Sequence, residues 1–333
     1  MKNHTLNRRH FLKKASILTT SISLLDNAFS FLPLPLHANR AKGKAVKIGW
    51  ITDVHHGYCT DAQKRLETFI HEANGKKLDF ILQGGDFCHP TAESKPFLDV
   101  WNSFKGEKYH VLGNHDMDKG TKQQIMDMWG MKEKYYSFDK GDFHFIVLDC
   151  NYILKDGQYL DYAHGNFYIS QKNRDHIHPE QIEWLKNDLA TTNKQCIIIS
   201  HQSIDEIWGG YGVSNRLDVR KVIDDANNRA DFQKVVACFC GHHHVDDHSY
   251  INKVHYFQMN SASYYYVGEG FGSDGAKAMY KDPLFAFVTI DPSGKIAIEG
   301  RQSQFVSPTP MEKKYRDAAR ISAVISDRKE RFR

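Results

Sequence analysis

Five short polar motifs occur along the chain, and each follows a short apolar run. In chain order they are Asp53-Val54-His55, Gly85-Asp86, Gly113-Asn114-His115-Asp116, His201 and Gly241-His242-His243-His244. Their carboxylate, amide and imidazole groups are oxygen and nitrogen donors, and the set contains no thiolate. Such donors suit Mn²⁺, Fe or Zn²⁺ better than a metal that prefers sulfur or a calcium ion that prefers oxygen alone. The motifs therefore predict a metal site.

The spacing inside two of the motifs indicates which side chains can act together. In an extended backbone, residues two apart face the same way, so Asp53 and His55 are expected to bind one ion. By the same rule His242 and His244 are expected to face together. His243 is then left over, and we assign it to no metal.

The apolar runs are predicted to be strands of a layered α/β fold, because they alternate with helix-like stretches. Strands are expected at residues 46–51, 80–83, 109–112, 143–148, 196–199 and 235–239, and a closing hairpin at 285–299. Helices are expected at 61–73, 96–104 and 180–189. In α/β folds, ligands bind outside the carboxyl ends of the strands, so the five motifs can converge although they are far apart in sequence.

The order of the motifs resembles the signature of the calcineurin-like metallophosphoesterases: Asp-x-His, Gly-Asp, Gly-Asn-His-Asp, His and Gly-His-x-His. All five blocks are present, and with the flanking strands the resemblance covers about residues 45–305. It implies an α/β fold in which a two-sheet β sandwich is flanked by helices. It also implies a dinuclear metal site at one edge and hydrolysis of phosphate esters.

The resemblance assigns seven ligands to two metal ions, which are Mn, Fe or Zn. One ion would be bound by Asp53, His55, Asp86 and His244, and the other by Asp86, Asn114, His201 and His242. Asp86 would then bridge the two ions. Two ions ~3.5–4 Å apart clamp an in-line displacement at phosphorus, and they lower the pKa of bound water towards ~7, which supplies a hydroxide as the nucleophile.

His115 is the motif residue that is not needed as a ligand. It resembles the family's catalytic histidine, which stabilises or protonates the leaving-group oxygen. Asp116 is expected to orient that imidazole and raise its pKa. Alternatively, Asp116 caps a helix that begins near Thr121.

Two long segments, 151–178 and 202–217, interrupt the strand and helix pattern and are rich in Tyr, Gly, Asn and His. Loops of this length are often functional. In the second segment, Trp208, Tyr211 and Arg216 are expected either to grip a phosphate and stack on a base or sugar, or to pack on one another. Further candidates for contact with the site or the substrate are His56, His89 and Tyr264-Tyr265-Tyr266.

The first residues resemble an export signal. Asn7-Arg8-Arg9-His10-Phe11-Leu12-Lys13 is similar to the twin-arginine signal of bacteria, and a moderately apolar stretch follows it. We expect residues 1–38 to be a signal segment, the twin-arginine export machinery to be a partner, and the protein to be periplasmic or otherwise exported. The alternative is a basic N-terminal helix. No later stretch approaches the ~20 apolar residues of a membrane span.

The charge of the chain argues against a stable nucleic acid partner. The formal net charge is +4, and residues 1–38 account for all of it with five basic residues and one acidic residue. The remaining chain is neutral and lacks the basic footprint that nucleic acid binding usually requires. A small phosphate ester is therefore the expected substrate.

The motif order looks like that of class III cyclic-nucleotide phosphodiesterases, so a phosphodiesterase is the leading hypothesis. Phosphomonoesterases and nucleotide pyrophosphatases share the motifs and remain alternatives, as does a non-catalytic interaction module of the same fold. The six cysteines are expected to be buried free thiols, because several lie in apolar runs. The charged tail, residues 306–333, is expected to form a solvated helix or a frayed end.

Overall fold

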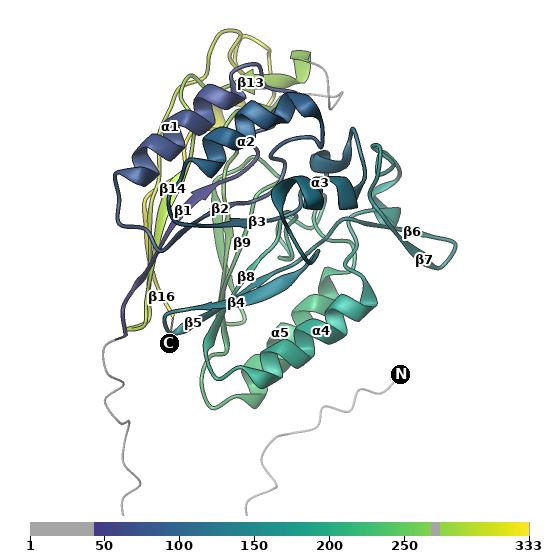
Figure 1. Cartoon of the computed structure of the whole chain (residues 1–333), viewed down its shortest axis with the longest axis vertical. Coiled ribbons are helices and arrows are strands. Elements are labelled where there is room, and N and C mark those ends of the chain that lie inside the picture. Colours follow the sequence, from purple (N-terminus) through teal and green to yellow (C-terminus); the bar gives the residue numbers. More distant parts are fainter. Residues whose placement is uncertain (1–42, 268–273, 333) are drawn as a thin grey trace, which may run out of the picture. The chain divides into compact units, whose positions relative to one another are not determined.

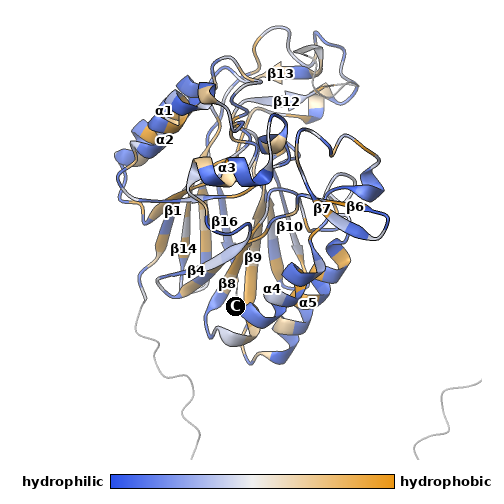
Figure 2. Ribbon diagram, turned by 45° about the vertical axis from the view of Figure 1, so that its right-hand side comes forward, coloured by the Kyte–Doolittle hydropathy of each residue, from blue (hydrophilic) through white to orange (hydrophobic). Residues whose placement is uncertain are grey.

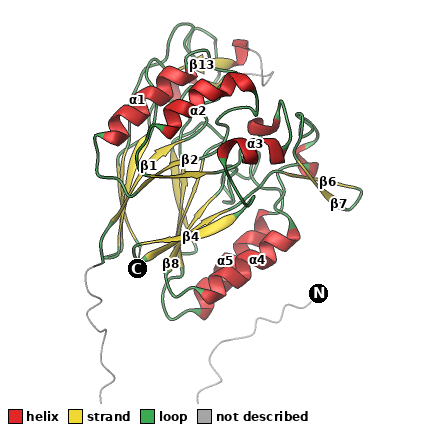
Figure 3. Ribbon diagram, viewed as in Figure 1, coloured by secondary structure: helices red, strands yellow, loops and turns green. Residues whose placement is uncertain are grey.

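The computed structural model describes residues 43–267 and 274–332, so the predicted signal segment at residues 1–38 lies outside the described residues. Across those ranges, two six-stranded sheets face each other, and helices cover their outer faces (Figure 1, Figure 3). This arrangement confirms the predicted α/β fold, a two-sheet β sandwich flanked by helices.

The first sheet has the strand order β16-β15-β14-β1-β2-β3. Its strands are β1 (Val46–Ile51), β2 (Phe80–Gln83), β3 (Glu107–His110), β14 (Ala286–Asp291), β15 (Lys295–Glu299) and β16 (Arg328–Arg331). Strands β1, β2 and β3 run parallel, whereas β14, β15 and β16 are joined to β1 and to one another by antiparallel pairing. Helices α1 (Ala62–Asn74) and α2 (Lys95–Asn102) cover the outer face of this sheet (Figure 1).

The second sheet has the order β10-β11-β9-β8-β5-β4. Its strands are β4 (Tyr136–Lys140), β5 (Phe143–Val147), β8 (Gln195–Ile199), β9 (Val235–Cys240), β10 (Asp247–Ile251) and β11 (Val254–Gln258). The central strands β5, β8, β9 and β11 are parallel. Helices α4 (Pro179–Thr191) and α5 (Arg216–Arg229) cover its outer face. Smaller elements are α3 (Lys122–Trp129), β6 (Tyr152–Lys155), β7 (Gln158–Asp161), β12 (Tyr264–Tyr266) and β13 (Lys277–Met279).

Three apolar layers hold the sheets and helices together. Trp50 and Phe145 lie in the layer between the sheets. Phe69, on the buried face of α1, belongs to the layer between the first sheet and helices α1 and α2. Leu185 of α4 and Val219 of α5 belong to the layer between the second sheet and these two helices. The central strands are therefore buried on both faces, which explains their continuous apolar runs (Figure 2). Buried apolar area contributes roughly 25 cal/mol per Å², so these layers supply most of the stabilisation of the fold.

The predicted strands at 46–51 and 80–83 are confirmed at both ends, and the predicted hairpin at 285–299 is confirmed as β14 and β15. The strand predicted at 109–112 is displaced, because β3 occupies Glu107–His110 and the chain leaves the sheet at Val111. The six cysteines are all buried and free, as predicted. None of the helices in the described ranges has the length and apolar character of a membrane span.

The helix predicted for the C-terminal tail is wrong. Within residues 306–332 the structure has a short 3-10 turn at Ala318–Arg320, and then strand β16 pairs antiparallel with β15. Phe332 is buried, and its ring meets Phe143 edge-on with 6.2 Å between ring centroids. These partners are distant in sequence, so tertiary packing overrides the local helical preference. The compact unit therefore continues past the boundary predicted at residue 305.

The loops that carry the polar motifs meet at one edge of the sandwich. They follow the carboxyl ends of β1, β2, β3, β8 and β9. Hydrogen bonds join loops from the two sheets: the Nδ1 of His201 lies 2.8 Å from the carbonyl oxygen of Gly84, and the amide of His242 lies 3.2 Å from Oδ2 of Asp53. The fold thus brings the five motifs together as predicted.

Candidate metal centre

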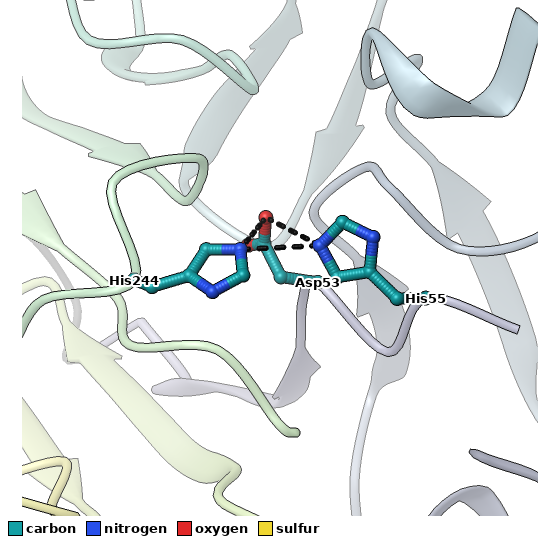
Figure 4. Close-up of side chains that lie close together, drawn as sticks. All are labelled: Asp53, His55 and His244. Atoms are coloured by element: carbon teal, nitrogen blue, oxygen red, sulfur yellow. Dashed lines mark hydrogen bonds and ion pairs between the residues drawn. The ribbon is translucent and has the colours of Figure 1, made fainter. Parts of the chain in front are cut away.

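The first group of donors contains Asp53 and His55 from the loop after β1, and His244 from the loop after β9 (Figure 4). All three are buried. The Nε2 atoms of His55 and His244 lie 3.1 Å apart, and they are 3.8 Å and 3.2 Å from Oδ1 of Asp53. Three donor atoms that converge in this way can bind one cation.

The second group contains Asp86, His201 and His242 from the loops after β2, β8 and β9. Nε2 of His201 lies 3.1 Å from Oδ2 of Asp86. The same Oδ2 atom lies 3.8 Å from Nε2 of His55, which belongs to the first group. Asp86 therefore occupies the position between the two groups that a bridging ligand requires.

Unsatisfied buried atoms show that the site fits metal ions. Oδ1 of Asp53 and Oδ1 of Asn114 are buried and have no hydrogen-bond partner among the described residues. Buried polar atoms are nearly always hydrogen-bonded, because leaving one unpaired costs about 1–3 kcal/mol. Two divalent cations would satisfy these atoms, since carboxylate, amide oxygen and imidazole are ligands that Mn²⁺, Fe and Zn²⁺ accept.

Hydrogen bonds to backbone carbonyls fix two of the imidazoles in the form that binds metal. Nδ1 of His201 is 2.8 Å from the carbonyl oxygen of Gly84, and Nδ1 of His244 is 2.7 Å from that of Tyr264. A carbonyl can only accept, so in each ring Nδ1 carries the proton that it donates. Nε2 can then present a lone pair to a metal, which is the usual arrangement of histidine ligands.

Electrostatic interactions inside the site favour a cation. Burial alone would raise the pKa of Asp86, but the neighbouring His201 and His115 outweigh it and hold that pKa well below its usual range. For His201, burial would lower the pKa, but the carboxylates of Asp86 and Asp53 raise it to about 10. The carboxylates are therefore ionised at neutral pH, and a metal ion has to displace a proton from His201 when it binds.

The backbone of the ligand loops differs from the extended form that the spacing argument assumed. Asp53, His55, Asp86, His242 and His244 all have left-handed φ values, from 52° to 68°. Residues other than glycine adopt this conformation infrequently, and it is concentrated at functional sites. His242 and His244 enter different donor groups, as the family resemblance implied, although the extended backbone from which their common orientation was predicted is absent.

The prediction that Asp116 orients His115 is also wrong. The carboxylate of Asp116 is buried and accepts four hydrogen bonds of 2.7 to 3.1 Å, from the backbone amides of Gly113, Asp86, Phe87 and Cys88. It does not cap α3 either, since Thr121 is the residue that does so. Asp116 instead joins the loop after β3 to the loop that holds Asp86.

Asp118, rather than Asp116, supplies the carboxylate that contacts the imidazole of His115, and the sequence reasoning missed it. Its Oδ2 lies 2.7 Å from Nδ1 of His115, and it also accepts hydrogen bonds from the hydroxyls of Tyr58 and Tyr168. Burial would lower the pKa of His115, but Asp86 and Asp118 raise it above its ordinary value. The sequence signal that could have identified Asp118 is its position three residues after His115. Side chains at i and i+3 align in a 3-10 turn such as the one at His115–Met117.

A cavity of about 280 Å³ opens onto the second donor group. Asp86, Asn114, His115 and His242–His244 line its polar side. Its other walls are formed mainly by Phe167, Tyr168, Arg174, Trp208, Tyr211, Val245, Tyr265 and Tyr266. The two long segments predicted to be functional thus contribute side chains to the cavity.

Three of the remaining candidates, Arg216, His56 and His89, do not line the cavity. Arg216 does not line the cavity, and the guanidinium that does so belongs to Arg174, which the sequence reasoning did not single out. His56 stacks on Phe97 with 4.6 Å between ring centroids, so it has a packing role. His89 is buried and packs edge-on against a tyrosine ring.

Comparison with known proteins gives one family and several similar folds. The family described as calcineurin-like phosphoesterase matches residues 46–246. A dimetal phosphatase from Danio rerio has a similar structure, with 15% identity, a TM-score of 0.56, and coverage of 77% of this chain and 96% of that chain. GAP50, described as the anchor in the inner membrane complex of Plasmodium, has 16% identity, a TM-score of 0.55, and coverage of 87% and 89%. The search of curated proteins gave no match.

The two aspartates near His115 should respond differently to substitution. Asp116→Ala leaves four buried backbone amides without their acceptor, so the free energy of unfolding should fall by about 3 kcal/mol or more, and bound Mn²⁺ should be lost. Asp118→Ala removes only side-chain contacts and should retain the metal with a smaller loss of stability. Urea denaturation and elemental analysis measure both effects. Wild-type stability and metal content in Asp116→Ala would contradict the assignment.

Proposed function

The chain belongs to the calcineurin-like phosphoesterase family, and from this premise we propose that it hydrolyses phosphate esters with two bound metal ions and prefers phosphodiesters. The observation that carries the proposal is the pair of donor groups, buried except for the half-buried His242, with Oδ2 of Asp86 between them. This arrangement suits a dinuclear centre, in which one carboxylate offsets the mutual repulsion of two cations.

The seven predicted ligands are the residues that would hold the ions. The first group of donors would bind one ion, and the second group together with Asn114 would bind the other. When bound, the ions would supply an activated hydroxide at neutral pH and would polarise the phosphate oxygens. The buried carbonyl partners of His201 and His244 keep both rings oriented, so the protein need not reorganise them during the reaction.

His115 would act on the leaving group. It lines the cavity beside Asn114, and its Nδ1 is bound to Asp118, which leaves Nε2 to hold a proton for the departing ester oxygen. The carboxylate of Asp118 would stabilise the protonated ring and fix its orientation, so Asp118 is a positioning residue. The hydroxyl of Tyr168 lies 3.2 Å from Nδ1 of His115 and 3.2 Å from Oδ2 of Asp118, and it further restricts the imidazole ring.

The character of the cavity supports a preference for diesters. A phosphodiester has one negative charge and two organic groups, whereas a monoester dianion needs more cationic contacts. Among the described lining residues, Arg174 carries the one guanidinium, and Gln171 and Asp175 already contact it. Aromatic walls from Tyr168, Trp208 and Tyr211 would instead contact apolar ester groups.

A non-catalytic interaction module is the alternative from another class. GAP50, whose fold is similar, is described as an anchor. In this chain, however, both donor groups are complete and His115 has a carboxylate partner. A module that only bound a partner would not require unsatisfied donor atoms in a buried site, so these observations favour catalysis.

Hydrolysis with a matched blank tests the proposed function. The protein supplied with Mn²⁺ should cleave bis(4-nitrophenyl) phosphate with a higher kcat/KM than 4-nitrophenyl phosphate. Asp86→Asn should lose roughly 100-fold or more of this activity together with its metal, because the bridging charge is removed. Asp99→Asn, an exposed change in α2, is the control and should be unaffected. An active Asp86→Asn variant would place the chemistry elsewhere.

The role of His115 predicts a dependence on the leaving group. His115→Ala should retain its metal ions but lose ~10²–10⁴-fold in kcat for poor, alkyl leaving groups, and much less for 4-nitrophenol, which departs without a proton. Asp118→Asn should show the same pattern with smaller losses. His71→Ala, a change on the exposed surface of α1, is the control. Equal losses for good and poor leaving groups would rule out proton donation by His115.

A further inference from the structure

A third group of side chains that could hold a metal ion lies beside the terminal strands of the two sheets. His248 comes from β10, His255 from β11 and Glu330 from β16. Strands β10 and β16 are the terminal strands of the second and first sheets. One ring nitrogen of each histidine and a carboxylate oxygen of Glu330 lie within 4.8 Å of one another.

This group is separate from the dinuclear centre. His255 is paired with Ala237, near the middle of β9, whereas His242 and His244 follow the carboxyl end of that strand. The reaction proposed above therefore makes no use of the third group.

Packing holds the two histidines in place. The pairing of β10 with β11 sets His248 opposite Phe257, and side chains two residues apart share a face, so His255 lies on that face as well. The rings of His248 and Phe257 stack with 4.6 Å between centroids, and those of His248 and His255 with 5.2 Å. Phe257 belongs to the apolar layer between the sheets, so the histidines face β16.

The hydrogen bonds of His255 prepare it to bind a metal. Its Nε2 lies 3.0 Å from the carbonyl oxygen of Arg331, which can only accept, so Nε2 carries the proton. Nδ1 of His255 therefore carries a lone pair, which accepts a hydrogen bond of 2.9 Å from Nε2 of His248. A metal ion at this position would replace the proton that the two nitrogens share. Two imidazole nitrogens bound to one tetrahedral Zn²⁺ lie about 3.3 Å apart, so a small widening would admit the ion.

Glu330 completes a set of two nitrogen donors and one oxygen donor. Its Oε1 lies 3.7 Å from Nδ1 of His248, whereas Nε2 of that ring is the nitrogen beside His255. A carboxylate oxygen of Glu330 nevertheless lies within 4.8 Å of one nitrogen of each ring. The side chain is 30% exposed, so it can rotate towards an ion bound by the two histidines. The nearby cation, Arg328, is paired with Asp246 at 3.0 Å and does not cancel the charge of Glu330. Two histidines and a glutamate are a donor set that Zn²⁺ adopts, with water in the fourth position.

We propose that His248, His255 and Glu330 bind one Zn²⁺ or similar divalent ion, apart from the dinuclear centre. The ion connects the C-terminal strand β16 of the first sheet to strands β10 and β11 of the second. It stabilises the folded chain because the unfolded chain does not hold these three residues together. Without an ion, the same residues form a hydrogen-bonded histidine pair next to a carboxylate.

Zinc stoichiometry tests the proposal separately from the proposed function. The Asp86→Asn variant, with its dinuclear centre disabled, should still bind about one Zn²⁺ per chain in equilibrium dialysis, and Zn²⁺ should raise its Tm by several degrees. Adding His248→Ala to this variant should abolish both the binding and the rise in Tm. Adding His71→Ala instead should change neither.

Glu330→Gln provides a second variant that preserves the shape of a partly exposed side chain. In the Asp86→Asn background it should weaken Zn²⁺ binding at least about tenfold while leaving the Tm without metal near its starting value. The proposal is overturned if Asp86→Asn binds no Zn²⁺, or if neither His248→Ala nor Glu330→Gln lowers the amount or the affinity of the Zn²⁺ that this variant binds.

Discussion

The carboxylate of Asp86 has to serve both donor groups and the loop of His115 at the same time. Its Oδ2 lies between Nε2 of His55 and Nε2 of His201, and its Oδ1 accepts a hydrogen bond of 2.8 Å from the backbone amide of His115. Asp116 holds the backbone amide of Asp86 in turn. One side chain therefore links both metal positions to the residue expected to act on the leaving group, and its placement depends on loops from both sheets.

The layered fold offsets the backbone strain that this placement requires. Five ligands have left-handed backbone conformations, and strain of this kind costs on the order of 1–3 kcal/mol per residue. Three apolar layers fix the strands that precede these loops, and hydrogen bonds such as that between the amide of His55 and the carbonyl of Asp86, at 2.9 Å, join the loops to one another. The strain is thereby concentrated where bound cations would compensate for it.

Sequence reasoning predicted the layers and the convergence of the motifs, because apolar runs and their polar ends are local signals. It did not predict which carboxylate contacts His115. The geometry of the 3-10 turn at His115–Met117 brings Asp118 rather than Asp116 to the imidazole, and the motif does not specify that geometry. The division of His242 from His244 depends on left-handed backbone that spacing alone does not reveal. The C-terminal strand was missed because its partners, β15 and Phe143, lie outside any local window.

The most direct test of the dinuclear centre is anomalous diffraction from crystals grown with Mn²⁺. The account predicts two anomalous peaks about 3.5–4 Å apart, one on each side of Oδ2 of Asp86, with His55 and His244 at one and His201 and His242 at the other. A single peak, or peaks that leave Asp86 without a metal contact, would contradict it.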